Sequence, residues 1–405
     1  MKSKEENPRG ITQADIVVGI PSSNEALSIP FPTQQADKGL LKYYSDSTAV
    51  IINCDNNSPD DTRQAFLQTA TTTPKIYIST DEDVQGKGNN LRNLFEKAVD
   101  LSAKAILVID ADVATITPLW IHNLCEPLFE DYEFVAPLYV RHKYDGPFTS
   151  NLIYPLTRAL YGRRVRQPIG GDVGISGRAA QMFLDAPYWD ENVAGFGINI
   201  WMTVTAMRNK IPVIQSFMGR PRVHRVRDTP TSMESMFKAV AGTAFDLMCR
   251  FDSFWKVVKW SRPTAVFGFG AGDVEMAPPV EIDTTILWNK MLEGLQTYGD
   301  FYGQFLNEEN RLKLEEVSGL PKEYFEFPTG LWAKIIYDFG LKYKTDEAAR
   351  DRLLDALLPL YYAKTLSFVL ETKDMNSQQV EEYIEDQCLQ FEKSKPYLLD
   401  RWFSS

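Results

Sequence analysis

Cysteine is scarce in this chain of 405 residues, and its few positions follow no pattern. The four cysteines have no paired spacing, which argues against a zinc motif or a disulfide framework and favours a reducing compartment. The charged first ten residues contain no apolar leader, and no later run approaches the roughly 20 apolar residues that cross a bilayer. The sequence therefore predicts a soluble, cytoplasmic protein without a membrane partner.

Positive charge is also in deficit. The chain has 43 Lys and Arg residues against 54 Asp and Glu residues, a net charge of −11. Nucleic acids and anionic membranes require a basic face, so neither is an expected partner. One local basic cluster departs from this balance, at Arg163, Arg164 and Arg166.

Short apolar runs alternate with amphipathic stretches between residues 15 and 214. The runs lie at 16–20, 49–52, 75–78, 106–109 and 134–136, and this alternation is typical of βαβ units with a mostly parallel sheet. Beyond residue 231, amphipathic stretches predict helices at 233–260, 284–306, 330–341, 348–370 and 377–392. We therefore predict an α/β fold with a Rossmann-like sheet domain over residues 1–230 and a mainly helical C-terminal domain over residues 231–405.

Two aspartates, Asp110 and Asp112, follow one of these apolar runs directly. Ligands bind at the carboxyl ends of the strands in open α/β sheets, so this D-x-D pair could bring a divalent cation and a diphosphate together. Acids also commonly end strands and cap helices. The interpretation therefore depends on the motifs that accompany the pair.

Three further motifs suit the binding of a nucleotide. The polar turn at residues 21–25 and Asp55 each follow a predicted strand, where they could hydrogen-bond a base or ribose, or could simply be turns and caps. Lys87 stands between two glycines before a predicted helix, and backbone amides with an ammonium form an anion-binding corner. The spacing of this turn differs from that of a P-loop.

Histidine is rare, with three residues in the whole chain. His224 stands where the α/β pattern ends, and imidazole is a suitable ligand for a Mn²⁺ or Mg²⁺ ion that carboxylate and phosphate also hold. His122 and His142 fall in a predicted helix and beside a predicted strand, and we expect structural roles for them.

In this order the motifs resemble the retaining GT-A glycosyltransferases that make glycosylglycerates, the mannosylglycerate and glucosyl-3-phosphoglycerate synthases. The resemblance spans about residues 15–228 and, more loosely, the helical tail. It rests on P-x-x-N-E at 21–25, D-x-x-S-x-D-D-T at 55–62, G-K-G at 86–88, D-A-D at 110–112, the segments 167–172 and 195–199, and R-x-H-R at 222–225.

The resemblance implies a UDP- or GDP-linked sugar donor and a divalent cation, Mg²⁺ or Mn²⁺, held by Asp112 and His224. Lys87 would lie near the phosphates, with Arg225 aiding charge stabilisation. The other implied donor contacts are Pro21, Ser22, Ser23, Glu25, Asp55, Asp110 and Ala111.

The resemblance also implies a loop beneath the sugar and the acceptor, at residues 167–172. In this loop the backbone carbonyl of Ile169 would lie near the anomeric carbon, and Asp172 would contact sugar hydroxyls. The implied acceptor contacts are Thr149, Gly170, Gly171 and Arg141.

The sequence departs from these families at two positions. Asn199 stands where the relatives carry an acid, and an amide cannot take up a proton at neutral pH. Pro147 stands where the phosphoglycerate enzymes carry an arginine, which favours a non-phosphorylated acceptor unless Arg141, Arg163 or Arg166 substitutes.

The expected function is the retaining transfer of glucose or mannose to a small hydroxy acid such as glycerate, by a front-side attack without an enzymic nucleophile. One alternative is an inverting GT-A transferase acting on a glycan, lipid or protein, with Asp172 or Asp190 as its base. The other is a nucleotide-sugar-binding protein without activity. A homodimer is possible in each case.

Overall fold

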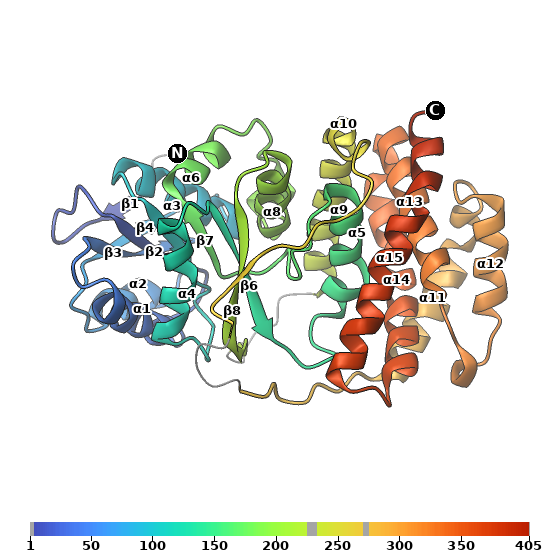
Figure 1. Cartoon of the computed structure of the whole chain (residues 1–405), viewed down its shortest axis with the longest axis horizontal. Coiled ribbons are helices and arrows are strands. Elements are labelled where there is room, and N and C mark those ends of the chain that lie inside the picture. Colours follow the sequence, from blue (N-terminus) through green and yellow to red (C-terminus); the bar gives the residue numbers. More distant parts are fainter. Residues whose placement is uncertain (1–3, 225–232, 270–274, 405) are drawn as a thin grey trace. The chain divides into compact units, whose positions relative to one another are not determined.

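The computed structural model describes residues 4–224, 233–269 and 275–404, and the chain forms two compact units (Figure 1). The first unit comprises residues 1–141, 167–231 and 264–277, and the second comprises 142–166, 232–263 and 278–405. These units differ from the predicted ranges 1–230 and 231–405. The difference arises because residues 142–166 pack with the C-terminal helices, whereas residues 264–277 pack with the sheet.

The first unit is built on a mixed sheet, and the expected mostly parallel α/β fold is confirmed. Strands β2, β3, β4 and β5 run parallel to one another, whereas β7 is antiparallel to both β5 and β6, and β1 is antiparallel to β4. In the order β1-β4-β3-β2-β5-β7-β6-β8-β9, the strands are Lys4–Glu6, Lys75–Ser79, Ala49–Asp55, Ile16–Ser22, Ala105–Val108, Val173–Ser176, Phe134–Val140, Val213–Pro221 and Val266–Phe267.

Helices cover this sheet through apolar faces that the sequence predicts. In α3, Leu91, Leu94 and Phe95 are fully buried, and Leu94 packs so closely on β2 that a Cβ at Gly19 would lie 2.1 Å from its side chain. The helices of this unit are α1 Pro30–Tyr43, α2 Thr62–Gln68, α3 Lys87–Asp100, α4 Pro118–Phe129, α6 Gly177–Leu184, α7 Glu191–Ala194 and α8 Ile198–Arg208.

The second unit is helical. Its α-helices are α5 Tyr154–Tyr161, α9 Met233–Arg250, α10 Asp252–Trp255, α11 Thr284–Tyr302, α12 Glu308–Ser318, α13 Thr329–Thr345, α14 Arg350–Thr372 and α15 Ser377–Trp402, with short turns η1 Thr149–Ile153, η2 Lys322–Tyr324 and η3 Glu347–Ala349. The predicted helix 233–260 is two helices, α9 and α10. Helices α5 and α12 are not among the helices that the sequence pattern predicts.

The expectation that no stretch of the chain is long and apolar enough to cross a bilayer is wrong. Residues Glu347–Thr372 form a helical stretch that is long and apolar enough to cross a membrane, with a mean hydropathy of 1.3. In the structure 89% of this apolar window is buried inside the protein, and Gly294 of α11 lies against Pro359 at its centre. Its apolar character is therefore explained by its position in the core of the helical unit.

Candidate active site

The candidate site lies in the sheet unit, where three parallel strands end side by side. β2 pairs with β3 and β5 in a register that places Ser22 opposite Asp55, and the Ser22 hydroxyl donates to an Asp55 oxygen at 2.6 Å. Because β5 ends at Val108 on the other side of β2, residues 110–112 emerge at this same edge. The structure thus brings the first, second and fourth predicted strand ends together.

Asp55 shapes the turn that follows β3. Its two carboxylate oxygens accept from Ser22, from the Ser58 amide at 2.7 Å, from the Ser58 hydroxyl at 2.7 Å and from the Tyr77 hydroxyl at 3.1 Å. These contacts fix the position of the turn at the edge where the parallel strands end. The contact of Asp55 with a nucleobase stays a prediction.

The turn at residues 21–25 is tied to the same region. The Asn24 amide donates to the Ser58 hydroxyl, and the Glu25 amide donates to the Thr62 hydroxyl, each at 2.8 Å. Pro21, Ser22 and Glu25 are buried, whereas Ser23 is exposed. The two predicted nucleotide-binding turns therefore form one hydrogen-bonded edge, while their donor contacts stay predictions.

Lys87 begins α3 and contacts Asp110. Its ammonium forms an ion pair with one carboxylate oxygen of Asp110. Burial opposes ionisation of this carboxyl, but the positive charges of Lys87 and Arg222 hold the pKa of Asp110 below its usual range. The flanking glycines are required sterically, because a Cβ at Gly86 or Gly88 would lie within 2.2 Å of the backbone carbonyls at residues 193–194.

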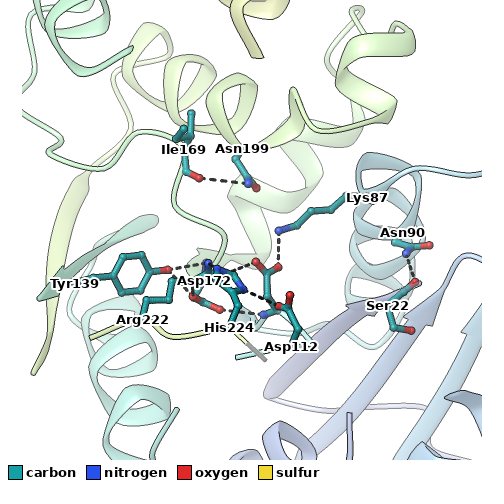
Figure 2. Close-up of polar contacts among 11 residues, drawn as sticks. Ser22, Lys87, Asn90, Asp112, Tyr139, Ile169, Asp172, Asn199, Arg222 and His224 are labelled. Atoms are coloured by element: carbon teal, nitrogen blue, oxygen red, sulfur yellow. Dashed lines mark hydrogen bonds and ion pairs between the residues drawn. The ribbon is translucent and has the colours of Figure 1, made fainter. Parts of the chain in front are cut away.

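Arg222 is a second cation of this cluster, which the sequence analysis did not assign. Its guanidinium bonds Asp110, donates from Nε to Asp172 at 2.7 Å and contacts His224 (Figure 2). Its side chain is 9% exposed and its guanidinium carbon lies 5.5 Å from the centroid of the Tyr139 ring. The signal was present in the R-x-H-R motif, where only His224 and Arg225 received roles.

Asp172 is held by the residues around it. It is fully buried, and its oxygens accept from the Asp110 amide at 2.9 Å, the Tyr139 hydroxyl at 2.5 Å and Arg222. Asp172 therefore positions Asp110 and Arg222, while its contact with sugar hydroxyls stays a prediction.

Asp112 and His224 are brought together as the sequence predicts. His224 Nδ1 lies 3.0 Å from Asp112 Oδ1, because the segment before and including His224 pairs antiparallel with the residues after Asp112. Val113 forms a β-bridge with His224, and the Ala114 amide donates to the Val223 carbonyl at 2.8 Å. The fold itself therefore creates this carboxylate and imidazole pair.

The donor set of this pair fits a divalent cation that is completed by other ligands. The described residues contain no group of three His, Cys, Asp or Glu side chains able to hold a metal. Asp112 is 7% exposed and His224 is 46% exposed, so the pair is open on the imidazole side. One carboxylate and one imidazole leave coordination positions for oxygen atoms of a bound diphosphate.

The loop at residues 167–172 approaches the aspartates closely. A Cβ at Gly171 would lie 2.2 Å from Asp110 Oδ2, and the Asn199 side-chain amide donates to the Ile169 carbonyl at 3.4 Å (Figure 2). Two buried oxygens near this loop, Gln167 Oε1 and Asn199 Oδ1, have no hydrogen-bond partner among the residues described. They are acceptors that a hydroxylated ligand could satisfy.

Four further predicted site residues lie in different parts of the chain. Thr149 belongs to the helical unit, and Arg225 lies outside the described residues. Arg141 follows β6, with its guanidinium carbon 5.3 Å from the centroid of the Tyr139 ring. Ala111 is buried between the two aspartates. The roles of these residues stay predictions.

The comparison with protein families agrees with the motifs of the sequence. Residues 20–186 match the family described as glycosyl transferase family 2, whereas the comparison with curated proteins gives no significant match. Among solved structures, the chain is similar to glucosyl-3-phosphoglycerate synthase from Mycobacterium tuberculosis in complex with Mn²⁺, UDP and glucosyl-3-phosphoglycerate. The two share 22% identity over 58% of this chain and 80% of that one, with a TM-score of 0.45.

Two further structures of that enzyme give similar values. The complex with Mn²⁺, UDP-glucose and glycerol 3-phosphate has 22% identity over 58% of this chain and 80% of that one, with a TM-score of 0.46. The complex with Mg²⁺ and UDP has 21% identity over 58% and 79%, with a TM-score of 0.45. Over residues 20–186 the chain is thus similar to glycosyl transferase family 2, and the prediction of a GT-A glycosyltransferase is confirmed.

Proposed function

We propose that this protein is a metal-dependent, retaining glycosyltransferase that moves glucose or mannose from a UDP- or GDP-linked donor to a small hydroxy acid such as glycerate. The observation that carries the proposal is the pair of Asp112 and His224 at 3.0 Å, beside the ion pair of Lys87 with Asp110. An acidic metal site next to a cationic helix start is suited to a sugar diphosphate.

Asp112 and His224 would hold a Mg²⁺ or Mn²⁺ ion, which supplies positive charge to the departing diphosphate when bound. Lys87 adds an ammonium at the start of α3, where the first backbone amides of a helix favour the binding of an anion. Arg222 fixes the orientation of Asp110 and contacts the imidazole of His224. These residues bind and orient the leaving group.

Retention is supported by the positions of the carboxylates near the loop. An inverting transferase needs a base beside the acceptor, and the two candidates for that role are engaged elsewhere. Asp172 is fully buried in its contacts with Tyr139 and Arg222, while Asp190 accepts from the Val193 amide at 3.0 Å as the cap of α7. We therefore infer that the departing phosphate oxygen takes the acceptor proton.

Polar atoms of the loop support a hydroxylated substrate. Gln167 Oε1 and Asn199 Oδ1 are buried acceptors without a partner among the residues described, and sugar or hydroxy-acid hydroxyls can donate to them. Of the arginines that could replace the missing phosphate-binding one, Arg166 is already paired with Glu381 at 2.8 Å. Together with Pro147 in place of the phosphate-binding arginine, the engagement of Arg166 favours glycerate over a phosphorylated acceptor.

The test of the proposed reaction is a panel of UDP- and GDP-linked glucose and mannose against glycerate, 3-phosphoglycerate and lactate, with and without Mn²⁺ or Mg²⁺. We expect metal-dependent transfer to glycerate with the donor's anomeric configuration retained in the product, as read by NMR. An inverted product would refute the front-side mechanism, and transfer that is independent of metal would refute the metal assignment.

Variants test the metal pair directly. Asp112→Asn should abolish metal-dependent nucleotide binding, because an amide is a far weaker ligand for a hard cation than a carboxylate. His224→Ala should weaken metal binding on the order of 10–100-fold. Titration calorimetry with Mn²⁺ and UDP measures the binding of both variants. His122→Ala is the control, since His122 stacks on Tyr43 with ring centroids 4.7 Å apart. Near-normal metal binding in Asp112→Asn would contradict the proposal.

A further inference from the structure

We propose that one end of the helical unit binds the surface of an anionic lipid bilayer. The binding surface is the exposed stretch after α10, formed by Lys256, Val257, Lys259 and Trp260 and called here the 256–260 patch. The proposal does not depend on the donor or acceptor of the glycosyl transfer. It revises the expectation from overall charge that the chain has no membrane partner.

The fold holds this stretch so that its apolar residues divide between the core and solvent. Trp255 is fully buried and its indole donates to the Met248 carbonyl at 2.8 Å. The Val258 carbonyl accepts from the buried Lys395 ammonium at 2.6 Å. By contrast, Val257 is 73% exposed and Trp260 is 66% exposed. The fixed neighbours therefore present these two side chains outward.

The backbone beyond the patch is also anchored. The Arg262 amide donates to the Gly162 carbonyl at 3.0 Å, and the Arg164 amide donates to the Arg262 carbonyl at 3.1 Å. Val258 packs against Gly162, where a Cβ would lie 2.8 Å from the Val258 side chain. The 256–260 patch is thus held at both ends by the helical unit.

The stretch is strongly basic in an acidic protein. Residues 252–262 contain Lys256, Lys259 and Arg262 against a single acid, Asp252, while the whole chain has a net charge of −11. The carboxylate of Asp252 accepts from the Trp402 indole at 3.2 Å. A local excess of positive charge therefore faces solvent here.

The nearest part of the 163–166 basic cluster adds to this excess. The backbone of Arg163 forms a β-bridge with Arg262, which places a further basic residue next to the same segment. Arg164 and Arg166 are paired with Glu385 and Glu381 respectively, so we do not count them. The charge of the surface is complementary to anionic phosphate groups.

Phe403 extends the apolar part of the surface. It is 40% exposed, the Lys256 ammonium lies 4.2 Å from the centroid of its ring, and α10 and the C-terminus lie at the same end of the helical unit (Figure 1). Trp and Phe side chains with flanking lysines are typical of the bilayer interface. Lysine is depleted in protein interfaces, which favours lipid over a protein partner or a second copy.

The test is co-sedimentation of the whole chain with vesicles of phosphatidylcholine alone and of phosphatidylcholine mixed with phosphatidylglycerol. We expect binding to the anionic vesicles only, weakened by added salt. The double variant Lys256→Glu and Lys259→Glu should weaken this binding at least about 25-fold, because each basic residue near an anionic surface contributes about fivefold. Trp260→Ser should weaken it through the loss of its apolar contact.

Matched variants separate the patch from general effects of charge and apolar exposure. Lys38→Glu with Lys393→Glu reverses two other exposed lysines, and Tyr324→Ser removes an aromatic side chain that is 78% exposed. These variants should bind as the wild type does, and circular dichroism should show the same thermal unfolding for all of them.

Three outcomes would overturn the proposal. The first is equal binding, or no binding, to the two kinds of vesicle. The second is anionic binding that Lys256→Glu with Lys259→Glu leaves unchanged. The third is a monomer–dimer equilibrium that Trp260→Ser abolishes in sedimentation velocity while no vesicle binding is seen, since the surface would then serve a second copy of the chain.

Discussion

Replacing Arg222 with methionine would remove the cation that joins Asp110 to Asp172 while keeping an unbranched side chain of similar length. Asp172 has no exposed surface and Arg222 is 9% exposed. Breaking a buried ion pair by removing one partner destabilises a protein by about 3–5 kcal/mol. Tyr139 and the Asp110 amide still bond Asp172, so we expect a loss near the lower limit, about 3 kcal/mol.

The loss should depend on pH with a defined sign. The folded-state pKa of Asp110 lies below its ordinary 3.8, in part through Arg222. Stabilisation of this kind is fully present above the unfolded-state pKa and fades as the pH falls toward the folded-state value. Urea unfolding should therefore show a larger difference between wild type and Arg222→Met at pH 7 than below about pH 4.

Arg220→Met is the matched control for this prediction. Arg220 lies two residues earlier, near the end of β8, but its side chain is 50% exposed and its ion pair with Glu275 spans 3.3 Å. Exposed ion pairs contribute about 0–1 kcal/mol. Equal losses of unfolding free energy in the two variants at pH 7 would refute the reasoning that burial makes Arg222 the organising cation.

Two further predictions concern steric fit and buried charge. Gly171→Ala places a Cβ 2.2 Å from Asp110 Oδ2 and should lower turnover on the order of 100-fold. Gly299→Ala is the control, because its Cβ meets nothing within 4 Å and turnover should stay unchanged. Similar turnover rates for the two variants would contradict the steric argument. Burial lowers the pKa of Lys395 to about 7 from 10.5. Between these two pH values the unfolded chain therefore binds more protons than the folded protein. The free energy of unfolding of the wild type should rise with pH across this window, by up to about 1.4 kcal/mol per pH unit. Lys395→Met should lose this rise of the unfolding free energy with pH, measured by urea unfolding at about pH 7.5 and about pH 9.5. An unchanged rise in the variant would contradict the lowered pKa of Lys395.

Much of the sheet unit follows from local features of the sequence. Apolar runs of strand length and an amphipathic α3 need no long-range information, because the periodicity of buried residues is set within each element. Since parallel strands end at one edge, the residues after β2, β3 and β5 were expected to meet there, and Ser22, Asp55 and Asp110 do so. The pairing of Asp112 with His224 was predicted from the resemblance of the assembled motifs.

Local sequence patterns could not predict the boundaries of the two units or the contacts of the buried charged residues. The assignment of residues 142–166 to the helical unit depends on contacts of α5 with α15, over 200 positions away in the chain, as in the bond of Arg158 with Glu385. The support that Asp172 gives to Asp110 and Arg222 depends on its complete burial. Burial is a property of the packed molecule.

The sequence alone therefore determined the kind of chemistry and the edge of the sheet that holds it, because residue type and hydrophobic period are local. Only the tertiary structure decided which charges neutralise one another. Arg222 reaches Asp110 across 112 positions of the chain, and it does so because the segment before His224 pairs antiparallel with the residues after Asp112. Electrostatic interactions act through space, so a short motif cannot specify which distant partner a charge will find.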